Sequence, residues 1–239
     1  PRLGHAVEMR LTAEDPDAGF APAPGLVAQF DVPLGPGIRV DSGVSQGDMI
    51  ASEFDSMIAK IIAHGKTRGE ALGRLRRALL ESSIVIQGGS SNKAFLLELL
   101  SHPKVIASDY DIGWLDQLTE NRGPPDRPLA DVALVRAAID VYDEELRVET
   151  RRFFAGAARG RPTVRPEIGF EARLSYGGQT YELVAQQLGP DRYRVVIDGG
   201  ERVEAHLDRF GDFGGFITVG GKSPRVKPAV KSRSPRQAR

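Results

Sequence analysis

A proline- and glycine-rich segment, residues 121–128, divides this chain into two parts with different hydrophobic periods. Its sequence, Asn-Arg-Gly-Pro-Pro-Asp-Arg-Pro, disfavours helix and strand because proline lacks an amide hydrogen and fixes its own φ angle. Before it, short runs of helical and strand period follow one another; after it, one long helical pattern precedes runs of period two. We therefore expect an α+β chain with domains at 1–120 and 129–221, joined by this linker.

Composition excludes several classes of function. The chain has no cysteine, which rules out disulfides and thiolate chemistry, and we expect a cytoplasmic protein. No run of about 18 apolar residues is present, so we expect no membrane span. The 32 basic residues balance the 32 acidic ones, which argues against nucleic-acid binding. Seven of the basic residues lie in 222–239, without acidic neighbours, and we expect this tail to be disordered.

Short strands dominate the first 65 residues. Alternation predicts a half-buried strand over 4–12, with Val7, Met9 and Leu11 on its apolar side. A Pro/Gly-rich loop over 13–25 then leads to strands over 26–32 and 38–44. Residues 49–64 are apolar apart from a charged interruption at Glu53 and Asp55.

Two helices are expected next. Thr67 and Glu70 have capping-box spacing and predict a helix of about 15 residues. Its apolar stripe is formed by Ala71, Leu72, Leu75 and Leu79. After a short strand at 84–86, Ser91 is expected to cap a second helix that Pro103 ends.

The second part reads as a long helix followed by a small antiparallel sheet or barrel. Apolar residues recur at helical spacing over about 129–156, namely Val132, Val135, Ile139, Tyr142, Leu146 and Phe153. From Phe170 onward the period is two, and Gly177-Gly178 and Asp198-Gly199-Gly200 are typical of hairpin turns.

The residues alone define no self-sufficient active site. None of the four histidines (His5, His64, His102 and His206) has a partner at metal-ligand spacing, so we expect no metal site. No phosphate-binding glycine loop precedes a predicted helix, and no nucleophile-elbow motif is present.

Several motifs in the first 115 residues, taken in order, resemble the C-terminal part of biotin carboxylase, the ATP-grasp component of biotin-dependent carboxylases. The similar segments are Gly-His-Ala-Val-Glu-Met-Arg-Leu at 4–11, Ala-Glu-Asp-Pro at 13–16, Gly-Ile-Arg-Val-Asp-Ser at 37–42 and Phe-Asp-Ser-Met-Ile-Ala-Lys at 54–60. Phe54 stands where the family usually has tyrosine.

This resemblance implies a ligase activity: ATP and bicarbonate form carboxyphosphate, and biotin on a carrier domain is then carboxylated. The family's Mg²⁺ ligands, phosphate-binding glycines and general base match no residue here. We therefore expect ATP, Mg²⁺ and biotin to be cofactors of a parent enzyme. We expect this chain to be a piece of that enzyme, inactive alone and binding none of the three by itself.

Two site residues follow from the resemblance. Arg39 matches an arginine near the ureido ring of biotin, where a fixed cation can stabilise developing negative charge. The alternative is a structural strand arginine paired with Asp41 or Glu53. Ile112 matches an apolar residue that packs on the adenine of ATP; the alternative is an ordinary core isoleucine.

Other charged residues have structural interpretations. Glu8, Arg10, Asp55 and Lys60 lie in or beside apolar segments and are expected to form buried or half-buried ion pairs around Arg39. The polar face of the helix at 68–82 is a candidate surface for a homo-oligomer, since these enzymes commonly dimerise through this half; a solvated face is the alternative.

The second part resembles the BT mediator domain of acyl-CoA carboxylase α-type chains by order and pattern. This implies docking to a carboxyltransferase, with a biotinyl carrier domain as a further partner. The alternative hypothesis is a non-catalytic scaffold module that binds carboxylase subunits.

Overall fold

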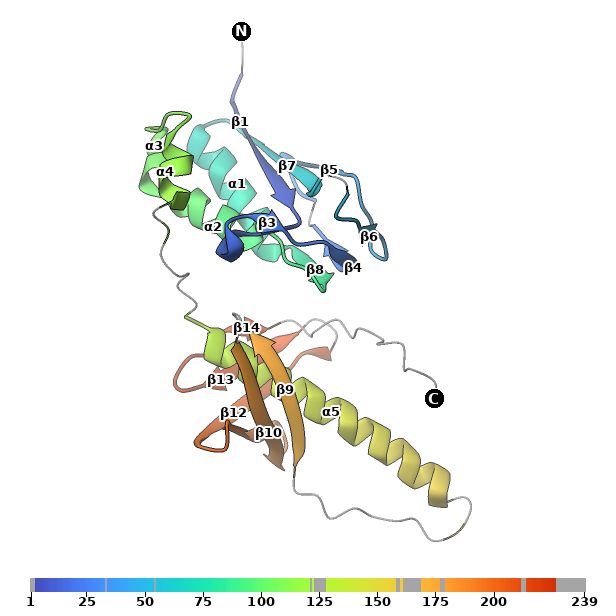
Figure 1. Ribbon diagram of the computed structural model, residues 1–239. Helices are drawn as coiled ribbons and strands as arrows, with labels where there is room; N and C mark the ends of the chain where they lie inside the picture. The colour runs from blue at the N-terminus through green and yellow to red at the C-terminus, as the bar shows by residue number, and fades with distance from the viewer. Residues whose placement is uncertain are drawn as a thin grey trace. The chain divides into compact units, whose positions relative to one another are not determined.

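The computed structural model describes residues 3–32, 34–53, 55–120, 122, 128–157, 160, 169–176, 179–211 and 214–226. The described residues up to 122 form one compact unit, called unit 1, and those from 128 onward form a second, called unit 2. Both mix helices with antiparallel sheets, which confirms the α+β class (Figure 1). None of the described helices has the length and hydropathy of a membrane span.

The central sheet of unit 1 has the strand order β1-β7-β5. Strand β1 (His5–Thr12) pairs antiparallel with β7 (Met57–Gly65), and β7 pairs antiparallel with β5 (Ile38–Ser42). One face is apolar and packs into the core, and the predicted side of β1 supplies Val7, Met9 and Leu11 to it. Since alternate residues point to opposite faces, the charged residues of these strands share the other face.

Smaller ladders complete the strands of unit 1. The predicted loop at 13–25 contains β2 (Glu14–Asp15), the short helix η1 (Pro16–Ala18) and β3 (Ala21–Pro22). A second three-stranded sheet has the order β6-β4-β8, formed by β4 (Gly25–Asp31), β6 (Met49–Ile50) and β8 (Ser83–Gln87).

Helix α1 (Arg68–Glu81) packs against β7 and β1 and confirms the predicted helix and its N-cap, Thr67, although the Glu70 carboxylate accepts from the Lys66 amide (Figure 1). The Thr67 hydroxyl accepts a hydrogen bond from the Glu70 amide at 3.2 Å, which satisfies one free donor of the first turn. All four residues of the predicted stripe are buried: Ala71, Leu72, Leu75 and Leu79. On the opposite face, Arg74 donates to the Glu70 carboxylate.

Helix α2 (Lys93–Ser101) begins one residue later than predicted, because Asn92 and not Ser91 is its N-cap. The Asn92 side chain does not cap the helix. It accepts from the Thr12 amide at 3.0 Å and donates to the Arg10 carbonyl at 3.1 Å, which ties the helix start to β1. Two short helices follow, α3 (Pro103–Ala107) and α4 (Trp114–Glu120).

Unit 2 consists of α5 (Ala130–Ala157) and one six-stranded antiparallel sheet in the order β14-β13-β12-β11-β10-β9. The sheet curls as a half-barrel around the first half of the helix (Figure 1). Its strands are β9 (Phe170–Tyr176), β10 (Gln179–Gly189), β11 (Arg192–Ile197), β12 (Glu201–Arg209), β13 (Gly215–Val219) and β14 (Arg225–Val226).

The predicted stripe of α5 is buried only in its first half. Val132, Val135 and Ile139 enter the core, whereas Leu146 and Phe153 are each 38% exposed. The predicted helix over about 129–156 is confirmed, but its apolar stripe is covered only in part. The helix runs past the sheet, so no strand is available to cover its second half (Figure 1).

A partly buried polar cluster joins α5 to the sheet. The Tyr193 hydroxyl donates to Asp143 of α5 at 3.2 Å and accepts from Arg209 at 2.9 Å. Arg209 also pairs with the Asp143 carboxylate. Three elements, α5, β11 and β12, therefore meet at one hydroxyl.

Some sequence predictions lie wholly or partly outside the described residues. These are most of the linker at 121–128, the turn at Gly177-Gly178 and the tail beyond residue 226. Residues 222–226, which the sequence assigned to the tail, are described: β14 pairs with β13, and Lys222 bonds Asp131 at 2.9 Å. Unit 2 thus extends past residue 221.

Candidate functional site

Arg39 lies in the middle of β5 with its side chain 74% exposed. Its neighbours Ile38 and Val40 pack on the core, so alternation directs the guanidinium to the open face of the sheet. Arg39 is opposite Ile62 of β7, and Ile62 is opposite Glu8 of β1. The predicted residue therefore belongs to a row that crosses all three strands.

A second row lies beside the first. Asp41 of β5 is opposite Lys60 of β7, and Lys60 is opposite Arg10 of β1. Across both rows, the open face carries the cations Arg39, Lys60 and Arg10 with the anions Asp41 and Glu8. These five residues carry one net positive charge, so the open face favours an anionic ligand.

Arg39 has one partner among the described residues. Its Nε donates to Asp41 Oδ1 at 2.9 Å, and this bond raises the pKa of the guanidinium above its ordinary value. The predicted alternative of an Asp41 pair is thus formed, while no contact with Glu53 is found. Within the described residues Nη1 and Nη2 make no hydrogen bond, so they can still donate to a ligand.

The remaining charged residues do not form the expected buried ion pairs. Glu8 and Arg10 pair at 3.8 Å, but their side chains are 42% and 69% exposed. Asp55 accepts a bond from the Met57 amide in an exposed turn. The expected buried or half-buried pairs are not found among the described residues: Glu8 and Arg10 lie on the open face, where water solvates them, and Asp55 lies outside the strands.

Ile112 lies in the turn before α4 and is 99% exposed. The alternative of a core isoleucine is therefore wrong. A fully exposed aliphatic side chain is available to pack on a flat ligand. Ile112 and Arg39 share no contact, and the structure does not bring the two predicted residues together.

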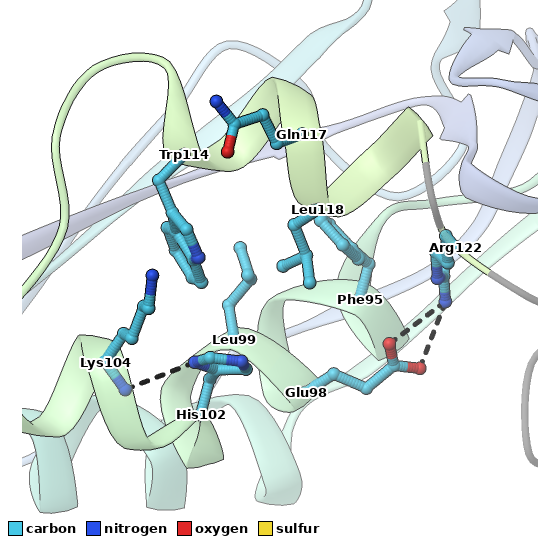
Figure 2. A pocket seen from close by; sticks show the side chains of 9 residues that line it. All are labelled: Phe95, Glu98, Leu99, His102, Lys104, Trp114, Gln117, Leu118 and Arg122. Carbon is cyan, nitrogen blue, oxygen red and sulfur yellow. Dashed lines mark hydrogen bonds and ion pairs between the residues drawn. The ribbon is translucent and has the colours of Figure 1, made fainter.

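The sequence did not point to a cavity of about 520 Å³ between α2, α3 and α4 (Figure 2). The side chains that line it are Phe95, Glu98, Leu99, His102, Lys104, Trp114, Gln117, Leu118 and Arg122. One signal was present, namely the only tryptophan of the chain, Trp114, close in sequence to His102 and Lys104. No group of three or more histidine, aspartate and glutamate side chains suitable for a metal ion was found among the described residues.

Comparison with known proteins identifies unit 1. Residues 8–117 match the family model of the biotin carboxylase C-terminal domain. Unit 1 is thus similar to the C-terminal domain of a biotin carboxylase-type chain. The matched residues include both Arg39 and Ile112.

Relatives extend the comparison. The biotin-dependent acyl-coenzyme A carboxylase alpha3 subunit of Mycobacterium leprae is 46% identical over 106 residues, 44% of this chain and 17% of that protein. The mitochondrial methylcrotonoyl-CoA carboxylase subunit alpha of Dictyostelium discoideum is 29% identical over 213 residues, 84% of this chain and 30% of that protein. The second match includes residues of both units.

A solved structure is similar as well. A variant of Rhizobium etli pyruvate carboxylase with acetyl coenzyme A matches at a TM-score of 0.51 and 31% identity, over 59% of this chain and 14% of that chain. The chain therefore spans less than a third of the length of each of these relatives.

Proposed function

We propose that this chain is part of a biotin-dependent acyl-CoA carboxylase and contributes to the ATP- and bicarbonate-dependent carboxylation of biotin. The observation that carries the proposal is Arg39, exposed within a matched biotin carboxylase domain, with Nη1 and Nη2 available for an anion. The names of the relatives, carboxylases of acyl-CoA substrates, support the substrate class.

In this proposal, Arg39 holds negative charge that develops on the ureido oxygen of biotin during proton removal. Asp41 fixes the guanidinium through Nε, so the two terminal nitrogens keep one orientation. A preorganised cation of this kind typically contributes about 10²–10³ in rate. Arginine suits the role because its charge persists in every environment.

The cofactors fit the described residues unequally. Ile112 fits one face of an adenine ring because its side chain is fully exposed. Mg²⁺ finds no cluster of carboxylates among the described residues, so we assign its binding to other parts of the enzyme. Bound ATP would supply the activated phosphate, and residues of this chain would pack against the nucleotide and orient it.

The test of Arg39 uses a complete biotin carboxylase that carries this segment. Arg39→Ala should lower biotin carboxylation by about 10²-fold or more and reduce bicarbonate-dependent ATP cleavage much less. Arg173→Ala, which removes an exposed arginine paired with Glu182 at 2.7 Å in unit 2, is the matched control and should change neither rate. Equal loss of both activities in a folded Arg39→Ala protein would contradict the assignment.

Ile112 is tested separately. Ile112→Ala should raise the KM for ATP about threefold to tenfold, since one apolar side chain on an adenine face contributes about 1 kcal/mol. Ile106→Ala is the control because Ile106 is also exposed, at 55%, on the neighbouring α3. An unchanged KM for Ile112→Ala would remove this residue from the proposed nucleotide site.

For unit 2 we propose a mediator role, docking a carboxyltransferase. The exposed second half of α5 supports this, since Phe154 is 67% and Phe153 38% exposed there. Apolar side chains in an open position are typical of protein interfaces. Two further partners are proposed. One is the carrier domain that presents biotin, and the other is a second copy of unit 1, which would face the arginines of α1.

Docking is tested by co-purification from a carboxylase carrying both units. Phe154→Asp, and deletion of residues 129–221, should each abolish recovery of the carboxyltransferase. Val184→Asp, at a 38% exposed position on the sheet, should leave recovery intact. Persistence of the complex after the deletion would refute docking. Loss of the complex, with carboxylation unaffected by Arg39→Ala, would favour the scaffold alternative.

A further inference from the structure

The cavity between α2, α3 and α4 has aromatic walls and an apolar floor. The rings of His102 and Trp114 lie with centroids 4.9 Å apart and planes at 55°, and Phe95 lines the far side (Figure 2). Leu99 and Leu118 complete the apolar lining. A volume of about 520 Å³ is within the range of small-molecule sites, and flat walls of this kind favour a planar ring.

The charged side chains that line the cavity, Glu98, Lys104 and Arg122, sum to one positive charge. Glu98 is neutralised by Arg122, whose Nη2 donates to both carboxylate oxygens at 3.1 Å. The Lys104 ammonium lies 6.0 Å from the centroid of the Trp114 ring and has no carboxylate partner among the described residues. A cation beside an aromatic wall suits a ligand that combines a ring with an anionic group.

His102 offers a further donor to the same space. His102 Nδ1 accepts a hydrogen bond from the Lys104 amide at 3.2 Å, so a neutral ring carries its proton on Nε2 (Figure 2). Nε2 has no partner among the described residues and can donate to a ligand. Arg122 Nη1 forms an ion pair with Asp17 at 3.7 Å, and Asp17 does not line the cavity.

We propose that this cavity binds a small planar aromatic carboxylate. The ring packs between Trp114 and the apolar floor, and the carboxylate accepts from Lys104 Nζ and His102 Nε2. Ile112 does not line the cavity, and the proposal does not depend on the carboxylase function. An aromatic carboxylate uses the ring walls, the Lys104 ammonium and the imidazole donor together.

The chain's only tryptophan makes the test direct. Titration of the full chain with 2-naphthoate should shift the single indole N–H signal of Trp114 in a ¹⁵N-correlated NMR spectrum, and the shift should saturate at one site. The uncharged analogue 2-naphthamide should bind about fivefold to tenfold more weakly, since it lacks the charge that Lys104 meets.

Lys104→Gln tests the charge without disturbing the core, because Lys104 is exposed. This variant should bind 2-naphthoate about fivefold to tenfold more weakly, whereas Lys66→Gln, the matched loss of an exposed lysine, should bind like the parent chain. The absence of a saturable shift at millimolar 2-naphthoate would overturn the proposal. Equal binding by the Lys104→Gln and parent chains would overturn it too.

Discussion

Tyr193→Phe should destabilise unit 2 by removing one hydroxyl from the joint between α5 and the sheet. Tyr193 is 2% exposed, and its hydroxyl bonds both Asp143 and Arg209. Burial raises the pKa of Tyr193, so the hydroxyl keeps its proton and remains a donor over the neutral range. Asp143 and Arg209 keep each other as partners after the change, which limits the loss.

The expected magnitude follows from these contacts. Hydrogen bonds to charged groups contribute about 1.5–3 kcal/mol each, and part of this is recovered by the remaining ion pair, so we expect a net loss of about 1.5 kcal/mol. For a domain near 100 residues, 1 kcal/mol shifts the Tm by about 4–8 °C, so the Tm of unit 2 should fall by about 6–12 °C.

The assay can distinguish the units. Trp114 fluorescence reports on unit 1 alone, because it is the only tryptophan, whereas circular dichroism reports on both units. Tyr193→Phe should lower the transition seen by circular dichroism and leave the fluorescence transition in place. Tyr181→Phe is the control, since its hydroxyl bonds Gln179 in an exposed position. Equal small effects of the two variants would refute the claim that this hydroxyl joins α5 to the sheet.

The other predictions concern the core and the edge of the sheet. Leu75→Ala should destabilise unit 1 by about 2–5 kcal/mol, because Leu75 is fully buried, and should lower the urea midpoint of the Trp114 fluorescence transition. Leu80→Ala, on the exposed side of α1, should have little effect. Similar midpoints for the two variants would contradict the packing of Leu75 in the core. Lys222, chiefly through its hydrogen bond, lowers the pKa of Asp131. The ionised Asp131 therefore stabilises the folded state above the ordinary aspartate pKa range, and this stabilisation is lost as the pH falls through the lowered pKa. Asp131→Asn should therefore reduce the Tm at neutral pH but not near pH 2, and an equal reduction at both would contradict the linkage.

Local sequence signals predicted much of the fold because each of them lies within a single helix or strand. The capping pair Thr67 and Glu70 and the stripe through Leu75 define α1 without help from the rest of the chain. Two-residue strands such as β3 and β14 carry no such pattern, since two residues cannot show a period. They exist because another segment lies beside them.

Errors arose where distant contacts decided the outcome. Ser91 and Asn92 are both good N-cap residues, and the choice depended on β1, about 80 residues away in sequence, whose Thr12 amide and Arg10 carbonyl bond Asn92. In α5, helical spacing continues to Phe153 although the sheet ends earlier. Periodicity predicts which face of a helix is apolar but not how much of that face a partner covers.

The candidate site shows the same division between local and distant information. Composition and spacing alone made Arg39 an ordinary strand arginine, and the family resemblance gave it a role. The cavity at Trp114 depends on three helices and was not predictable from any one of them. Its residues are separated by turns whose course the sequence pattern did not specify.

Fold and proposed chemistry are connected through the two-residue period of β5. Ile38 and Val40 pack on the core, and this packing directs Arg39 and Asp41 together to the open face, where Asp41 can hold Nε of the guanidinium. A shift of one residue in the pairing of β5 with β7 would bury both charges and expose both apolar side chains, at a cost that the native register avoids. The hydrophobic core therefore fixes the orientation of Arg39, although Arg39 itself makes no contribution to that core.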